Sequence, residues 1–314
     1  MHKIILTFDV EDFIDPNEVV ALQNILELLD KHRLRALFFI TGHMAEKLEA
    51  FPEILGLLER HEIGFHSSGH SVRPTIPEFT DVENYEQARA ISLERETSHI
   101  NPLTGEVEGE GGIHLLQDLF HNKRIEAFRA PGMSWTPPHL EAMTEVGIKF
   151  DFSSNVTTSA PVQHAGVTFY PYTFIQTWEG HSSDYSCLFS AILKREVSVF
   201  DLHPTLYVNQ RMWDAIYHNG NPQRLSRVPE RTPEETKSYF NKFANLLKLI
   251  NGLQKARIVN ADPILRESTT NLITNENDVE RYYRCSRRWP EKFFNYSPHF
   301  MRLHFSKFFK STLH

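Results

Sequence analysis

The chain has 314 residues, of which 40% are hydrophobic and 23% charged, and its formal net charge at pH 7 is −7. This composition is ordinary for a globular protein and excludes collagen-like and low-complexity chains. Two cysteines, Cys187 and Cys285, are too few for a disulfide framework. No run approaches the about 18 apolar residues of a membrane span. No secretory leader opens the chain, so we expect a cytoplasmic protein.

The first part of the chain alternates between strand and helix patterns. Apolar, β-prone runs predict strands at 3–9, 37–40 and 63–66. Helical spacing of apolar residues predicts helices at about 17–32 and 43–60. Strands separated by helices in this way indicate a mostly parallel sheet with helices packed outside it. The expected fold class is therefore α/β.

The alternation is interrupted between 71 and 122 and then resumes. We expect a charged helix at 81–98 and a Gly- and Glu-rich loop at 101–112, which either covers the substrate or is only a solvated acidic loop. Later helices are expected at about 113–121, 137–146 and 232–250, and strands at 125–128, 148–151, 166–178 and 196–202. The helix near 232 has a clear start, with Thr232 as N-cap and Pro233 at its first position.

Residues 281–314 differ in composition from the rest of the chain. They hold eight basic residues against one acid, Glu291, and ten aromatic residues. We expect one domain over 1–280 followed by this tail. The tail is a helix whose aromatic side chains dock on the domain, a segment that lies on an anionic membrane surface, here the inner membrane, or, least favoured, a nucleic-acid-binding segment. We predict no nucleic-acid partner.

Two histidines in the segment after the third expected strand point to a metal site. His66 and His70 are four residues apart, so on a helical turn both imidazoles face the same way and can share one cation. Such a pair alone is equally compatible with core or surface residues. An acidic third ligand would complete a site of two histidines and one carboxylate, which leaves coordination positions open for water and substrate.

Three carboxylates follow one another closely where the first expected strand ends. Asp9, Glu11 and Asp12 form either a solvated acidic turn or a partly buried cluster. Like charges this close raise one another's pKa unless a cation lies between them. A metal that takes one carboxylate, with a neighbouring base that keeps another, resolves the repulsion.

Five ordered clusters together resemble the motifs of the polysaccharide deacetylase family, the family 4 carbohydrate esterases. The clusters are Thr7-Phe8-Asp9 with its nearby acids, His66-Ser67-Ser68-Gly69-His70, Arg129-Ala130-Pro131-Gly132, Asp151-Phe152-Ser153 and Leu202-His203-Pro204. The resemblance spans about 3–204. It implies a distorted (β/α) barrel with a divalent metal, usually Zn²⁺, that hydrolyses N-acyl or sometimes O-acyl groups on sugars.

The resemblance also assigns roles to single residues. Asp9 would be the general base, and Arg129 would pair with it and orient it. His66 and His70 would bind the metal. His203 would be the general acid that protonates the departing amine.

The match is less direct at two of the motifs. Asp151 would support the site by holding His203 or Arg129. Typical members place the metal-binding Asp directly after the base, where Val10 stands here, so the carboxylate ligand is Glu11 or Asp12. Strand alternation puts Glu11 on the same face as Asp9, which favours Glu11.

Two neighbouring residues have competing interpretations. Trp135 follows the Arg-Ala-Pro-Gly turn and is either a wall on which a sugar stacks or a core residue. Asp201 precedes the Leu-His-Pro motif, but we expect strand alternation to point its side chain away from His203, as in a surface or supporting residue.

The expected function is a metal-dependent hydrolase that removes an acetyl or formyl group from an amino sugar. The absent leader favours a nucleotide-linked or lipid-linked precursor of a surface polysaccharide, as in lipopolysaccharide biosynthesis. Two alternatives remain: a hydrolase of non-sugar amides on the same fold, and a catalytically silent carbohydrate-binding relative.

Overall fold

The computed structural model describes residues 2–154, 160–172, 174–175, 196–212, 227–263 and 272–275. The chain divides into two compact units, each treated separately below. The first unit comprises residues 1–40, 44–64 and 172–270, and the second comprises 41–43, 65–171 and 271–314. Both cysteines and the tail at 281–314 lie outside the described residues, so the expected boundary at residue 280 stays a prediction.

The first unit is built on β1 (His2–Val10), a strand whose nine residues are all buried. Its neighbours are parallel: β11 (Val197–Leu202) pairs along most of its length, β2 (Leu37–Ile40) pairs with its second half, and β12 (Val259–Ala261) with its first residues. β10 (Phe174–Ile175) lies next to β11, and β3 (Glu62–Phe65) next to β2. Buried parallel strands read as continuous apolar runs, which is why the sequence predicts β1, β2 and β11 correctly.

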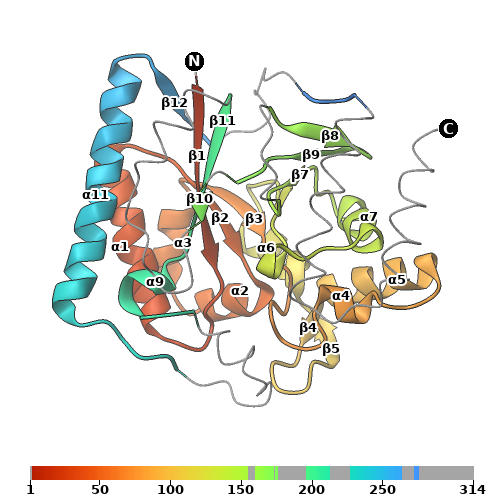
Figure 1. Ribbon diagram of the computed structural model, residues 1–314. Coiled ribbons are helices and arrows are strands. Elements are labelled where there is room, and N and C mark those ends of the chain that lie inside the picture. The colour runs from red at the N-terminus through yellow and green to blue at the C-terminus, as the bar shows by residue number, and fades with distance from the viewer. Residues whose placement is uncertain are drawn as a thin grey trace. The chain divides into compact units, whose positions relative to one another are not determined.

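Two long helices pack together beside this sheet, α1 (Asn17–His32) and α11 (Pro233–Lys255) (Figure 1). In α11 the buried residues recur at helical spacing, and they are Phe243, Leu246, Leu247 and Ile250. Thr232 caps α11 in a capping box with Glu235, as its sequence predicts.

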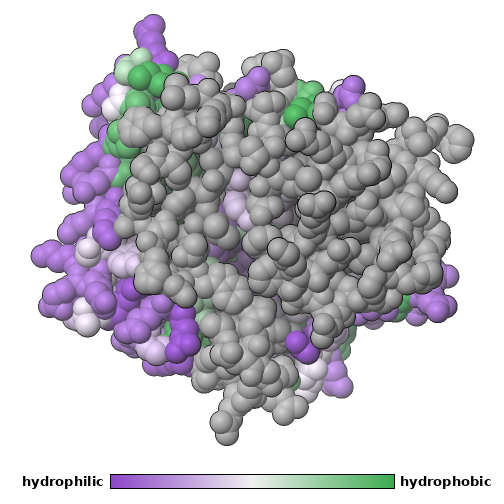
Figure 2. Space-filling view, viewed as in Figure 1, coloured by the Kyte–Doolittle hydropathy of each residue, from purple (hydrophilic) through white to green (hydrophobic). Residues whose placement is uncertain are grey.

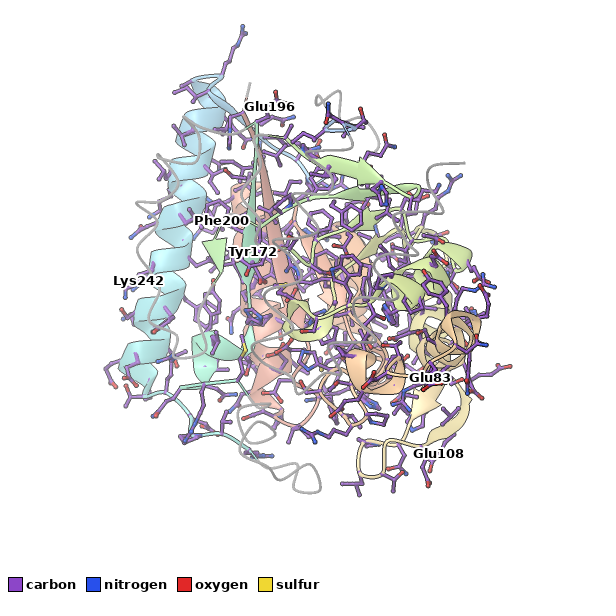
Figure 3. All side chains as sticks on the ribbon, turned by 45° about the vertical axis from the view of Figure 1, so that its right-hand side comes forward. Glu83, Glu108, Tyr172, Glu196, Phe200 and Lys242 are labelled. Carbon is purple, nitrogen blue, oxygen red and sulfur yellow. The ribbon has the colours of Figure 1, made fainter. Side chains whose placement is uncertain are left out.

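The outward face of α11 is hydrophilic and appears purple at the left of Figure 2. Lys242 on α11 and Phe200 on β11 are both labelled in Figure 3, the first exposed and the second fully buried. The exposed face of α11 is therefore solvated, and its apolar face covers the core.

The helix expected at 43–60 is two helices, α2 (Gly42–Leu48) and α3 (Pro52–Leu58). The break falls at Phe51, whose φ of −128° and ψ of 68° are not helical. Pro52 causes it, because proline has no N–H for an intrahelical hydrogen bond and disfavours helical geometry in the residue before it.

The second unit holds a smaller sheet of short strands. β6 (Ala127–Phe128), β7 (Phe150–Asp151) and β9 (Val167–Phe169) are parallel, and β8 (Val162–His164) pairs antiparallel with β9. β8 and β9 form a hairpin over Ala165 and Gly166, whose φ values of 49° and 77° fit a two-residue turn. The single strand expected at 166–178 is wrong in its bounds, because β9 ends at Phe169 and a separate strand, β10, covers Phe174–Ile175.

Helices and a second hairpin complete this unit. The helices are α4 (Ile76–Phe79), α5 (Tyr85–Glu96), α6 (Gly112–Leu119) and α7 (Pro137–Glu145), with a 3-10 turn at Pro131–Met133. The segment expected as a loop at 101–112 belongs mostly to a hairpin of β4 (Ser98–Ile100) and β5 (Val107–Glu110). Glu108, labelled in Figure 3, is exposed on β5 and accepts a hydrogen bond from Asn101.

Both units therefore combine parallel strands with helices, and the predicted α/β class is confirmed. Within the described part of the chain, none of the helices is both long and apolar enough to cross a membrane.

Candidate active site

The three carboxylates of the first motif are buried in the first unit. Asp9 lies near the end of β1 and is 2% exposed, and Glu11 and Asp12 in the following segment are 2% and 0% exposed. A solvated acidic turn is therefore excluded. Buried carboxylates are costly unless they are neutral, hydrogen-bonded or paired with a cation.

Both carboxyl oxygens of Asp12 accept hydrogen bonds within the protein. Its Oδ1 accepts from the backbone N–H groups of Ile14 and Asp15, and its Oδ2 accepts from the Thr205 hydroxyl at 2.9 Å. Burial raises the pKa of Asp12 to about 6, although the bonds from Asp15 and Thr205 act in the opposite direction. Asp12 thus organises the segment after β1 and ties it to α9 (Thr205–Val208).

Further acids extend this cluster away from β1. Asp15 accepts from the Asn209 side chain at 3.1 Å, and Lys47 donates to the Asp15 carbonyl at 2.7 Å. Glu18 is fully buried, and neither of its carboxyl oxygens has a hydrogen-bond partner. Burial, reinforced by the charges of Asp12 and Glu11, raises the pKa of Glu18 well above its ordinary value. Burial thus favours the protonated form of Glu18.

Asp9 lies beside the histidine of the last motif. Its Oδ2 is 3.6 Å from Nε2 of His203, and both side chains are at most 5% exposed. The register of β1 with β11 brings them together, since Phe8 lies opposite Leu202. The expected base and acid are thus neighbours within one unit.

The expectation that Asp201 points away from His203 is wrong. Asp201 is fully buried, and one of its oxygens lies within 4.8 Å of ligand atoms of both Asp9 and His203. Residues two apart in an extended segment project from the same face, and this places Asp201 and His203 together. Asp201 therefore adds a third polar group to the Asp9 and His203 pair.

The two histidines of the second motif are neighbours in the second unit. His66 and His70 are 1% and 5% exposed, and their ring centroids are 5.1 Å apart. Nδ1 of His66 lies 2.7 Å from the Arg129 carbonyl oxygen. A carbonyl only accepts, so Nδ1 donates and the lone pair of the neutral ring stands on Nε2. This tautomer is the one that binds a metal through Nε2.

Arg129 and Asp151 also lie in the second unit. Arg129 is fully buried, and its Nε donates to the Phe152 carbonyl at 3.2 Å. Asp151 accepts from the Ser153 N–H and hydroxyl at 2.9 and 2.8 Å. Burial raises the pKa of Asp151 to about 7, against the opposing effects of Ser153 and of the Arg129 charge. Asp151 thus interacts with Arg129 through the electrostatic effect of the guanidinium charge, and the hydrogen bonds described here join it to Ser153.

The structure favours the second interpretation of Trp135, that of a core residue. It is 4% exposed and stacks on Phe169 of β9, with ring centroids 5.9 Å apart and an interplanar angle of 30°. It is a core residue of the second unit.

Sequence reasoning missed the partners that hold these groups. Thr205 and Asn209 bind the buried acids of the first unit. Glu96 binds Ser67 and Ser68, between the two histidines. The position of Thr205, two residues after His203, could have marked it as a neighbour of the site. No feature of the sequence marks Glu96 in this way. The pairing of Arg129 with Asp9 and the complete metal ligand set stay predictions.

Comparison with known proteins finds one family model that matches part of the chain. Residues 1–150 match the family model described as "Polysaccharide deacetylase". A search of curated proteins found no match.

Several solved structures resemble the chain at low identity. A polysaccharide deacetylase-type protein from Mycobacterium smegmatis is 14% identical with a TM-score of 0.49, covering 85% of this chain and 94% of that one. A family 4 carbohydrate esterase from Streptomyces lividans, in complex with acetate, is 14% identical with a TM-score of 0.45, covering 87% and 98%. A family 4 pseudoenzyme from Bacillus anthracis is 14% identical with a TM-score of 0.41, covering 79% and 61%. At these TM-scores, the family assignment rests on the sequence match.

Proposed function

The chain belongs, through its first 150 residues, to the polysaccharide deacetylase family, and from this premise we propose that it is a metal-dependent hydrolase of N-acyl amino sugars. The observation that carries the proposal is the buried pair of Asp9 and His203, with side-chain atoms 3.6 Å apart. A carboxylate next to an imidazole, both at a strand end, provides a base and an acid for amide hydrolysis. The family fold is a distorted (β/α) barrel, as the motif resemblance implies.

The residues fit a divalent cation. His66 and His70 lie side by side in the second unit, and the bond from His66 Nδ1 to a carbonyl sets the tautomer that ligands require. We propose Glu11 as the carboxylate ligand, because the oxygens of Asp12 already accept from Ile14, Asp15 and Thr205. Two histidines and one carboxylate suit Zn²⁺ and leave open positions.

Each reacting group has one task. A bound divalent cation supplies Lewis acidity, which lowers the pKa of water and polarises a carbonyl. Asp9 takes a proton from water at a carboxylate oxygen. His203 gives a proton from Nε2 to the departing amine, which is a poor leaving group without it.

Arg129 and Asp151 support this pair. The Arg129 guanidinium is fully buried and requires an anionic partner, and we propose that Asp9 is this partner. Asp151 is half-ionised near neutral pH, because its pKa is about 7. Its charge near Arg129 therefore varies with pH and with the charge of the surroundings.

We further propose that the substrate is a nucleotide-linked or lipid-linked precursor of a surface polysaccharide, deacylated in the cytoplasm. The support is the basic, aromatic composition of 281–314, which suits contact with anionic lipid at the inner membrane. Vesicle flotation with and without these residues tests the contact. We expect the full chain to bind anionic vesicles and the shortened chain to lose most of the binding. Equal binding by the two chains contradicts the membrane role.

The test of the activity is release of acetate or formate from a panel of N-acyl amino sugars, free, nucleotide-linked and lipid-linked. The acid that appears identifies the acyl group, and the best substrate identifies the carrier. Release from small non-sugar amides in place of the sugars supports the amidase alternative. Metal binding and sugar binding without any release would indicate a silent relative.

A further inference from the structure

The loop that carries His66 and His70 is held in a strained conformation. Ser67 has a φ of 65° and His70 a φ of 47°, both in the left-handed region that side chains other than glycine rarely adopt. Such conformations persist only where the surroundings over-determine them. The second unit must therefore contain groups that fix this loop.

One buried carboxylate, that of Glu96, binds the loop at two successive residues. Glu96, the last residue of α5, is 1% exposed and receives the Ser67 hydroxyl at 2.8 Å and the Ser68 N–H at 2.7 Å. Its backbone carbonyl also accepts from the Ser68 hydroxyl at 3.2 Å. The side chain and the backbone carbonyl of Glu96 together thus bind Ser67 and Ser68, which lie between the two histidines.

Glu96 is in turn fixed by a histidine that has no other hydrogen bond. His139 on α7 is fully buried, and its Nε2 donates to Glu96 Oε1 at 2.9 Å. Its Nδ1 has no hydrogen-bond partner, and its ring packs near Phe79 and Phe128. Burial alone would raise the pKa of Glu96, but the bond and charge of His139, with the bonds from Ser68 and Ser67, bring it below its ordinary value. Glu96 is therefore an anion at neutral pH.

Two glycines let the loop approach this anchor. Gly42 donates its N–H to the Ser67 carbonyl at 3.0 Å, and a Cβ on Gly42 would lie 3.0 Å from the Ser68 backbone. Gly112 has a φ of 55°, and a Cβ there would overlap the Ser68 hydroxyl and the Glu96 carbonyl. Backbone therefore lies close against the loop on these sides, and a side chain at either glycine would push it away from Glu96.

We propose that Glu96, held by His139, is a positioning residue for metal binding: it fixes the Ser67-Ser68 segment and thereby sets the separation and direction of His66 and His70. The inference rests on the proposed function, because it takes the two histidines as ligands. Neither Glu96 nor His139 belongs to the five motifs, and neither contacts the ligand side chains in the hydrogen bonds described above.

Glu96→Gln is the direct test, with Glu126→Gln as its matched control. Glu126 is a carboxylate of the same unit, 8% exposed, that pairs with Lys149 at 2.9 Å away from the loop. Ser67→Ala is the milder variant, since it removes one hydroxyl donor and leaves Glu96 in place. Three properties are measured: the Zn²⁺ dissociation constant by competition with a chromophoric chelator, the visible spectrum of the Co²⁺-loaded protein, and amide hydrogen exchange of the metal-free protein.

We expect Glu96→Gln to weaken Zn²⁺ binding by about 10–100-fold and Ser67→Ala by less, as for other groups that support ligands. The Co²⁺ bands should shift in both variants, and the amides of 67–70 should exchange faster without metal. Glu126→Gln should match wild type in all three. Unchanged affinity, spectrum and exchange in both loop variants, with metal bound by wild type, overturns the positioning role alone. Absence of metal binding by wild type overturns the proposed function, and the inference with it.

Discussion

The two units hold their polar residues in different ways. Among the described residues of the first unit, six carboxyl groups are at most 2% exposed, and they are Asp9, Glu11, Asp12, Asp15, Glu18 and Asp201. Several are satisfied by near neighbours, as when Asp12 accepts from Ile14 and Asp15. In the second unit the histidine loop depends on residues far along the chain, with Glu96 on one side and the Arg129 carbonyl on the other.

The difference is one of charge as well as distance. The first unit concentrates buried carboxyl groups, and burial together with the charges of Asp12 and Glu11 raises the pKa of Glu18. In the second unit Glu96 is hydrogen-bonded to His139, and the charge of Arg129 lowers the pKa of Asp151 against the larger effect of burial. The first unit thus gathers buried carboxyl groups, and the second holds its histidine loop through residues that are distant in sequence.

Removal of a nitrogen ligand should have the largest effect. His66→Ala is expected to weaken Zn²⁺ binding by more than about 100-fold, beyond the loss seen when supporting residues are removed, and to abolish acid release. Elemental analysis after dialysis and an acetate or formate assay measure the two losses. His114→Ala, which removes an exposed histidine of the same unit, is the control. Full metal content in His66→Ala would contradict the ligand assignment.

Removal of the base should separate chemistry from metal binding. Asp9→Asn is expected to lower kcat by roughly 10²–10⁴-fold, because a positioned base contributes about that much. Metal content should stay at the wild-type level, since the proposed ligands are Glu11, His66 and His70 and not Asp9. Asp30→Asn, at an exposed ion pair with Arg60, controls for the loss of a carboxylate. A kcat within about threefold of wild type would exclude Asp9 as the base.

Adjacent acids in the first unit should behave differently. Glu11→Gln is expected to weaken Zn²⁺ binding by more than about 10-fold, whereas Asp12→Asn should keep the metal. Asp12→Asn should instead cost about 1–3 kcal/mol of unfolding free energy, because its donors lose their charged acceptor. Metal titration and urea denaturation of both variants decide between them. The reverse pattern would make Asp12 the ligand.

Asp151 should change the pH dependence of stability without removing a proposed ligand or the proposed base. Its folded pKa of about 7 lies above the unfolded value of 3.8, so between these pH values the folded state binds more protons than the unfolded one. Unfolding free energy therefore falls as pH rises from about 4 to 7, by at most about 1.4 kcal/mol per pH unit from this group. Asp151→Asn should flatten that slope in metal-free protein, measured by denaturation at each pH. The exposed Asp118→Asn should not, and an unchanged slope in Asp151→Asn would rule out the raised pKa.

Sequence patterns succeeded where local order determines the outcome. β1 and α11 were predictable because a continuous apolar run marks a buried strand, and because an N-cap Thr followed by Pro marks the start of a helix. The placement of Asp9 beside His203 follows from both lying at the ends of adjacent parallel strands.

Long-range contacts were beyond such reasoning. Glu96 lies in a charged helical segment whose sequence resembles that of a solvated helix face. Its burial depends on contacts such as the one with Ser68, 28 residues earlier, which the local sequence does not indicate. The hairpin of β4 and β5 was missed because its strands are short and β5 is exposed along its whole length. Pro52 indicates a helix break, but the helical spacing of apolar residues on both sides of it led to the prediction of one continuous helix.

Metal dependence of acid release tests the central claim most directly. Protein stripped with a chelator should release no acetate or formate from N-acyl amino sugars. Titration with Zn²⁺ should restore release linearly up to one equivalent, while Asp9→Asn binds the same equivalent and stays inactive. Undiminished release by the stripped wild-type protein, or restoration that needs no His66, would contradict a metal-dependent deacylase.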